Sequence, residues 1–287
     1  MSEANSADAA DTGAAALSAG ALIVAYDGTN FAGYARQSDP PQRTVQEELE
    51  RALATALHLP DATPLATVVA GRTDAGVHAA GQVVSFSGAG FAPTSFSRNA
   101  FLRSLNALTP TDISVRDLIF VSPDFSARFD AVSREYRYRI AGAPAPPLFL
   151  RPYVWHLPGF GADANRRAQM EQAAAILVGE HDFSSFAVTA SLAGKNPVRR
   201  ILSLDFCEAE YFGEPVIEIR IVGTAFLHSM VRTLVGTLVD LYAGRIKPGA
   251  LPAILAARKR SAAGQTAPAC GLTFHGVTYP CFSSCYS

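Results

Sequence analysis

The residues best suited to chemistry stand together in one segment, Gly71 to Ala79, which reads Gly-Arg-Thr-Asp-Ala-Gly-Val-His-Ala. This segment places one carboxylate, Asp74, two residues after the guanidinium of Arg72. A nearby positive charge typically lowers a carboxylate pKa by roughly 1 to 3 units. Glycines at positions 71 and 76 let the backbone turn tightly and approach a ligand closely. The pattern predicts an ionised Asp74 that is ready to act as a nucleophile or a base at neutral pH.

Asp74 also has a purely structural interpretation, a β-turn in which its carboxylate caps backbone amides. An isolated Asp-Ala-Gly favours the turn, whereas the full nine-residue segment favours the chemical role. The short apolar run from Leu65 to Ala70 predicts a strand that leads into this loop.

The segment resembles the active-site motif of the TruA family of tRNA pseudouridine synthases, in which the Asp of Gly-Arg-Thr-Asp-Ala-Gly-Val-His is the catalytic residue. The match is unbroken over eight positions. Other segments match in the order that the family requires, and together they cover about residues 21–280. They are Tyr26-Asp27-Gly28 with Phe31 and Gly33, Gly81 to Val84, Ala127 to Phe129, Arg134 to Tyr138, Gly179 to Phe183, and Phe226 through Met230-Val231-Arg232 to Gly236.

The resemblance implies roles for further residues, position by position. Arg72 would fill the space left when the target nucleotide leaves the stack, which offsets part of an extrusion cost of a few kcal/mol. Tyr136 would stack on the extruded uracil, and its hydroxyl is a candidate proton-transfer group. Leu272 would form an apolar wall of the pocket, and Arg232 would pair with Asp74.

Each of these residues has an ordinary alternative: a surface Arg, a core Tyr, or a helix Arg that faces solvent. Around Arg232, however, the helix is apolar at Leu227, Val231, Leu234, Val235, Leu238 and Leu241. A largely buried helix leaves its Arg in need of an anionic partner, and Asp74 is the best candidate.

Two further positions near the motif are weighed separately. His78 is expected to be structural, because nothing in the sequence supplies a Ser or Cys nucleophile for it to activate. After Tyr26-Asp27-Gly28 the family usually has Gly-Trp-Gln, whereas this chain has Gly33-Tyr34-Ala35. Tyr34 keeps an aromatic surface but lacks the indole N–H, so the details of tRNA contact are expected to differ there.

The order of the expected elements indicates an α+β fold of two halves that meet across a cleft. This agrees with the pseudouridine synthase fold that the resemblance implies, in which two α/β halves form one mainly antiparallel sheet with a central active site. We expect a disordered tail over 1–20, an N-terminal half over 21–142 that carries Asp74, a Pro-rich interruption over 143–147, a C-terminal half over 148–287, and loose residues at 281–287. Strands are expected at 21–26, 65–70, 82–87, 112–121, 133–140, 201–210, 215–222 and 272–278, and helices at 45–58, 94–107, 163–178, 226–243 and 249–259.

Composition is that of a globular protein. The 287 residues are 49% hydrophobic and 17% charged, and no apolar run approaches the roughly 18 residues that suggest a membrane span. The first 20 residues lack the charged start of a signal peptide. The four cysteines form no disulfide framework, which favours a reducing, cytoplasmic location. A zinc site that uses Cys281 and Cys285 is a weak alternative.

The charge balance matters for an RNA partner. The net charge is −1, but three acidic residues lie in the expected tail, which leaves 24 basic and 22 acidic side chains. Of the 24 cations 21 are Arg, which binds phosphate and stacks on bases, although genomic base composition explains the bias equally well. RNA binding therefore requires a segregated basic face. Its candidates are Arg134, Arg137 and Arg139; Arg166 and Arg167; Arg199 and Arg200; and Arg258, Lys259 and Arg260, each of which is otherwise an ordinary solvated face.

The resemblance implies an isomerase that converts uridine to pseudouridine at positions 38–40 of the tRNA anticodon stem-loop, acting as a homodimer in which one tRNA contacts both subunits. No cofactor and no metal is expected, since isomerisation needs neither redox change nor an activated donor. Asp74 would attack C1′ of the sugar, attack C6 of the base, or abstract the C2′ proton, and the sequence does not choose among them. The alternatives are a related synthase acting at other tRNA positions or on other RNAs, and a noncatalytic RNA-binding protein on the same fold.

Overall fold

The central element of the molecule is a ten-stranded sheet. The computed structural model describes residues 19–37, 39–60, 65–87, 91 and 97–285. The sheet is mainly antiparallel, so the expected fold class is confirmed. Its strands are β1 (Ala19–Tyr26), β2 (Thr67–Val69), β3 (His78–Ser87), β4 (Ile113–Val121), β5 (Ser133–Ala141), β6 (Trp155–His156), β7 (Gly179–Asp182), β8 (Val198–Tyr211), β9 (Glu214–Gly223) and β10 (Leu272–Thr278).

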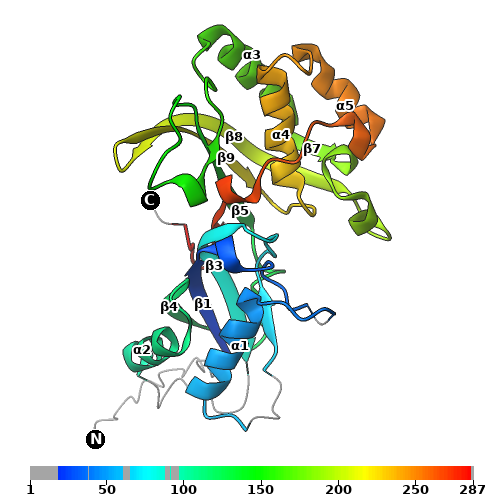
Figure 1. Cartoon of the computed structure of the whole chain (residues 1–287). Helices are drawn as coiled ribbons and strands as arrows, with labels where there is room; N and C mark the ends of the chain where they lie inside the picture. Colours follow the sequence, from blue (N-terminus) through cyan, green and yellow to red (C-terminus); the bar gives the residue numbers. More distant parts are fainter. Residues whose placement is uncertain (1–18, 38, 61–64, 88–90, 92–96, 286–287) are drawn as a thin grey trace, which may run out of the picture.

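The described residues form five α-helices, which lie toward the two ends of the molecule. Helices α1 and α2 lie at one end of the molecule, and α3, α4 and α5 lie at the other (Figure 1). The helices are α1 (Val45–Ala56), α2 (Arg98–Leu108), α3 (Ala164–Ala174), α4 (Met230–Tyr242) and α5 (Leu251–Ala257). No helix among the described residues is long and apolar enough to cross a membrane.

Strand β10, from the end of the chain, lies inside the sheet and not at its edge. The strand order is β4-β1-β3-β10-β5-β9-β8-β7, with β2 beside β3 and β6 beside β5. Strand β10 thus returns from the C-terminal half and lies between β3 and β5, where Phe274 pairs with both Ala79 and Tyr136. The centre of the sheet therefore brings together a strand that follows the motif loop and a strand that carries Tyr136.

Local sequence accounts for the start of α1. The Thr44 hydroxyl caps the helix by accepting a hydrogen bond from the backbone N–H of Glu47. Val45, Leu49 and Leu53 then face the core at helical spacing.

Helix α4 is almost completely enclosed. Twelve of its thirteen residues are buried, and the exception is Arg232. The apolar pattern around Arg232 is confirmed as a buried helix, but α4 begins at Met230 and not at 226 as expected. Ser229 precedes it in the left-handed conformation, with φ 57°, which is uncommon for a residue with a Cβ. The chain therefore turns sharply just before the helix.

Other boundaries also differ from expectation. Strand β3 begins at His78 rather than 82, β1 begins at Ala19, and the short strands β6 and β7 were not predicted. The expected helix over 94–107 begins at Arg98, and residues 94–96 lie outside the described residues. The expectation of a loose C-terminus is wrong for residues 281–285. Ser284 is buried there, and its hydroxyl donates to the Gly81 carbonyl at 2.6 Å.

Candidate active site

The motif loop forms a β-turn, but Asp74 does not cap it. The Val77 N–H donates to the Asp74 carbonyl at 3.2 Å, and Gly76 takes φ +75°, a conformation that favours glycine. Among the described residues, the hydrogen bonds of the Asp74 carboxylate come from side chains of another segment, residues 229–232. The turn interpretation is thus right for the backbone and wrong for the carboxylate.

Three side chains of the 228–232 segment surround that carboxylate. Arg232 Nη1 donates to Asp74 Oδ2 at 2.9 Å, and the Ser229 hydroxyl donates to the same oxygen at 2.8 Å. His228 Nε2 lies 3.4 Å from Oδ1. The side chains of Asp74 and Arg232 are 21% and 19% exposed, so the pair is shielded but still reachable. Arg232 Nε donates to the Ala267 carbonyl at 2.8 Å, which fixes its guanidinium in place.

Hydrogen bonds from neighbouring segments hold the motif loop in place. Gln82 Nε2 donates to the Gly71 carbonyl at 2.7 Å, and the Tyr26 and Thr73 hydroxyls lie 2.7 Å apart. The Tyr34 N–H donates to the Thr73 carbonyl at 3.1 Å. These contacts hold the loop at Gly71 and Thr73, just before Asp74, and explain why segments far away in the sequence accompany the motif.

Two glycines of the Tyr26–Gly33 region fit closely against the same loop. A Cβ on Gly28 would lie 2.0 Å from the Val77 carbonyl oxygen. Gly33, at φ +116°, would bring a Cβ within 3.0 Å of the Thr73 carbonyl oxygen. Both positions therefore require glycine for the loop to hold this shape.

Tyr136 lies on β5 between two other aromatic rings. Phe226 and Phe274 meet it edge to face, each with a ring centroid 5.0 Å away. Desolvation by burial raises the pKa of the Tyr136 phenol well above its ordinary value, and the nearby Tyr26 and Asp74 raise it further. The hydroxyl is therefore protonated at neutral pH, so it can donate a proton or a hydrogen bond.

These residues line one cleft of about 780 Å³. Among its described lining residues, Asp74 is the only carboxylate and seven side chains are cationic. Of those seven, Arg36 and Arg232 pair with a carboxylate of the described residues. The cleft therefore has a strong positive bias that the net charge of the chain conceals. The seven are Arg36, Arg72, Arg128, Arg134, Lys195, Arg199 and Arg232.

The structure brings most of the expected site residues into this cleft. Asp74, Tyr136, Arg232, Arg72, Leu272 and Arg199 all line it. Arg72 is exposed there, and Leu272 is a buried apolar wall. Arg200 is exposed and is not a lining residue. It neighbours Arg199 on β8, and successive strand residues point to opposite faces of a sheet.

His78 and Tyr34 are buried next to the motif loop. The Gly28 N–H donates to His78 Nδ1, and His78 Nε2 lies 3.0 Å from the Pro152 carbonyl oxygen. Burial lowers the pKa of His78, which favours the neutral ring that these contacts require. Tyr34 is 1% exposed, so it supports the loop mainly from inside the core.

In two of the four expected basic clusters, all members but Arg134 pair with carboxylates. Arg137 and Arg139 pair with Glu218 at 3.2 and 2.9 Å, and the adjacent Arg134 is buried. Arg166 and Arg167 pair with acidic residues around α3. The hypothesis of a free basic face is therefore wrong for these four arginines, because neighbouring carboxylates take up their charge, whereas Arg134 has no carboxylate partner among the described residues and lines the cleft.

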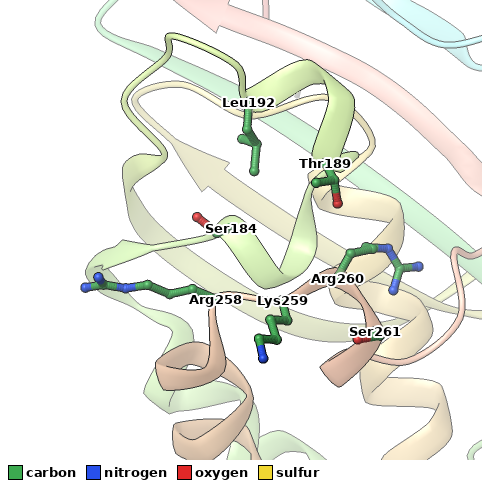
Figure 2. A pocket seen from close by; sticks show the side chains of 7 residues that line it. All are labelled: Ser184, Thr189, Leu192, Arg258, Lys259, Arg260 and Ser261. Atoms are coloured by element: carbon green, nitrogen blue, oxygen red, sulfur yellow. The ribbon is translucent and has the colours of Figure 1, made fainter.

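The fourth cluster, at residues 258–260, borders a second hollow of about 520 Å³. Figure 2 shows Arg258, Lys259 and Arg260 pointing in different directions around it. Arg258 pairs with Asp182 at 3.0 Å, while Arg260 donates to the neutral Gly264 carbonyl and Thr266 hydroxyl. Because the three side chains diverge, they spread positive charge over a surface and do not converge on one small ligand.

Three residues that complete the site had no predicted role: Phe226, His228 and Ser229. A signal was present, since positions three and four residues before Arg232 would share its helix face. The helix begins only at Met230, however, so the left-handed turn at Ser229 and not helical spacing brings these side chains to Asp74.

Fold and cleft together define an enzyme-like site in which one carboxylate faces a cationic channel. A family model described as tRNA pseudouridine synthase matches residues 22–130 and 173–280, and the chain belongs to this family, whose enzymes are isomerases. Over 256 residues it is 41% identical to "tRNA pseudouridine synthase A" of Bacillus licheniformis, covering 89% of this chain and 97% of the relative. A Methylobacterium nodulans protein of the same name is 42% identical over 260 residues, covering 90% of this chain and 95% of the relative. The predicted TruA resemblance and isomerase class are thus confirmed.

Proposed function

We propose that this protein isomerises uridine to pseudouridine in tRNA, at positions 38–40 of the anticodon stem-loop, with Asp74 as the group that starts the reaction. One observation carries the proposal: a single partly exposed carboxylate faces a cleft lined by seven cations. Such a cleft attracts a phosphate backbone and holds one reactive group against it. The two relatives that share about 41% identity with the chain carry the name of this activity.

The carboxylate is asymmetric in a way that suits this role. Oδ2 accepts hydrogen bonds from both Ser229 and Arg232, while Oδ1 faces only the more distant His228 nitrogen among the described residues. Oδ1 is therefore the oxygen that remains for the substrate. Attack on C1′, attack on C6 and abstraction of the C2′ proton all need one such oxygen.

The remaining lining residues have complementary tasks. Arg72 enters the space that the extruded uridine vacates, and Tyr136 and Leu272 flank the uracil. The N1–C1′ bond breaks, the uracil rotates and the C5–C1′ bond forms; the proton on C5 leaves and N1 takes up one proton, so the product is an isomer of the substrate. Every atom of the product apart from exchanged protons comes from the substrate, so the reaction needs no donor. A cytoplasmic homodimer is part of the proposal, and light scattering of the purified protein tests the assembly.

Asp74→Asn tests the chemistry. The amide cannot act as nucleophile or base, so we expect pseudouridine formation to be abolished while tRNA affinity stays within about tenfold, roughly 1.4 kcal/mol. Asp124→Asn is a matched control, because Asp124 is exposed and lies outside the cleft lining. Appreciable product from the Asp74→Asn enzyme would remove Asp74 from this role.

Mapping pseudouridine in total RNA from cells with and without the gene tests the substrate. Loss of modification at positions 38–40 supports the proposal. Loss at other tRNA positions, or in other RNAs, would assign the protein to a related synthase activity. If no modification changes, the noncatalytic RNA-binding alternative is favoured.

A further inference from the structure

One conspicuous residue of the cleft has no part in the reaction outlined above. Phe129 lines the cleft, yet its side chain is 78% exposed. Large apolar side chains that stay exposed in a concave site commonly mark a contact with a ligand. The Ala127-Arg128-Phe129 segment belongs to the family resemblance, but neither the motif loop nor the carboxylate geometry accounts for its Phe.

The turn that carries Phe129 is rigid. The Ser126 N–H donates to Asp130 Oδ2 at 2.8 Å, and the Asp130 N–H donates back to the Ser126 carbonyl at 3.1 Å. The Phe129 N–H donates to the Ser126 hydroxyl at 3.3 Å. Ala127 is fully buried beneath the turn. The ring is therefore presented on a fixed platform and not on a loose loop.

A buried cation ties this platform to the active site. Arg134 donates hydrogen bonds to the carbonyls of Arg128 and Ala131 within the turn and to the carbonyl of Ala70, the residue just before the motif loop. It also donates to the Thr224 carbonyl, at the end of β9. No described carboxylate lies within ion-pair distance of Arg134. The turn, the motif loop and the 224–232 segment are thus held in one fixed arrangement.

The Arg128 side chain lies over the Phe129 ring. Its guanidinium carbon lies 5.2 Å from the Phe129 centroid, and the side chain is exposed with no ion pair to a described carboxylate. An Arg beside an exposed aromatic ring matches one nucleotide, since the base stacks on the ring and the phosphate meets the guanidinium. Tyr136, by contrast, is nearly buried between Phe226 and Phe274, deeper in the cleft.

We propose that Phe129 is a stacking platform for a base next to the extruded uridine, with Arg128 on the adjoining phosphate. This inference rests on the proposed function, because it takes RNA as the occupant of the cleft. Stacking on an aromatic ring tolerates any base, so Phe129 holds the strand in register without reading its sequence.

The test compares side chains that keep or lose the aromatic face. Phe129→Leu retains apolar bulk and removes stacking, so Kd and KM for tRNA should rise roughly five- to a hundredfold, with a smaller effect on kcat. Phe129→Tyr keeps the ring and should remain within about threefold of wild type. Thermal unfolding should be unchanged in both variants, because the side chain is exposed.

Phe212→Ala is the matched control. Phe212 is 79% exposed in the turn between β8 and β9 and is not a lining residue of the cleft, so its loss should leave tRNA affinity unchanged. Light scattering verifies that the assembly state is the same for all variants. If Phe129→Leu binds tRNA like wild type, or if Phe212→Ala weakens binding equally, the stacking proposal is overturned.

A fluorescent variant separates this proposal from the proposed function. Trp155 is the only Trp of the chain, so Phe129→Trp in a Trp155→Phe background reports on position 129 alone. Stacking predicts quenching of its fluorescence by tRNA and by a short single-stranded RNA. If RNA quenches the Phe129→Trp variant but the wild-type enzyme does not isomerise uridine, the proposed function is wrong and the stacking proposal stands. If the wild-type enzyme isomerises uridine but RNA causes no quenching, the stacking proposal is wrong and the proposed function stands.

Discussion

At the scale of single residues, the orientation of Tyr136 separates its two suggested tasks. The edge-to-face contacts with Phe226 and Phe274 hold the ring plane, while the backbone of Gly71 approaches the hydroxyl. A Cβ on Gly71 would lie 3.7 Å from that oxygen. The ring therefore offers a fixed surface for a base, and the hydroxyl is directed toward the motif loop.

Tyr136→Phe removes the hydroxyl and keeps the ring. If the phenol transfers a proton, kcat should fall by about 10² to 10⁴ while tRNA affinity stays near the wild-type value. Tyr136→Leu should lose stacking as well, so KM should rise in addition. Single-turnover assays at saturating tRNA measure both effects. A fully active Phe variant would reject the proton-transfer role and leave stacking in place.

At the scale of elements, the site depends on close backbone contacts between loops that are distant in the sequence. Gly28 follows β1, and its Cα lies directly against the backbone of Val77 at the start of β3. The contact is with backbone and not with a flexible side chain, so a substituent at position 28 cannot be accommodated by a rotamer change.

Gly28→Ala should therefore displace the motif loop. Overpacking of this kind typically costs about 1 to 3 kcal/mol of stability, and we expect kcat to fall by at least about tenfold because Asp74 moves away from Arg232. Gly249→Ala is the control, since a Cβ there meets nothing within 4 Å. Urea denaturation and turnover assays measure the two quantities. Normal kcat in Gly28→Ala would show that loop position does not limit catalysis.

At the scale of the whole molecule, the charge of the cleft depends on which face of the sheet each Arg occupies. Arg199 lines the cleft and donates to the carbonyls of Asn196 and Val198, whereas Arg200 is exposed outside the lining. Burial lowers the pKa of Arg199, but a guanidinium remains charged in a protein.

Arg199→Gln should weaken tRNA binding and reduce the magnitude of the slope of log K against log salt by about one contact, roughly 0.7 to 0.9. Arg200→Gln, the adjacent control, should change neither quantity. Filter-binding titrations across a salt series measure both variants. Equal effects of the two substitutions would mean that the RNA path is not confined to the cleft face.

Buried phenols make the whole fold sensitive to alkali. Desolvation raises the pKa of Tyr26 to about 12 and shifts the phenols of Tyr136, Tyr138 and Tyr279 in the same direction. In the unfolded chain these groups ionise near pH 10. Below that pH their contribution is fully present. Above it the unfolded state loses protons that the folded state retains, so stability falls.

We expect the free energy of unfolding to decrease above about pH 10, by up to about 1.4 kcal/mol per pH unit for each such tyrosine. Urea denaturation between about pH 8 and pH 11 measures this. Tyr138→Phe should make the decline shallower, because it removes one of the titrating groups. A pH-independent unfolding free energy over that range would contradict the prediction.

Residue order alone predicted the α+β class and, through the resemblance of its motifs, the family. The same resemblance singled out Asp74, Arg72, Tyr136 and Arg232 as candidate site residues. Local order along the chain supported part of this independently, through the Gly-flanked carboxylate of Asp74, the alternation in strands and the apolar helix around Arg232. The buried helix around Arg232 and the strand carrying Tyr136 follow from side-chain periodicity, which is a local property.

The assembled fold set which partner each charged side chain finds. It placed β10 between β3 and β5, turned Ser229 and His228 onto Asp74, and left Phe129 exposed in the cleft. It also neutralised Arg137 and Arg139 with Glu218 and separated Arg199 from Arg200. Ion pairs and burial depend on distances between segments far apart in the chain, and these distances exist only once the sheet has assembled.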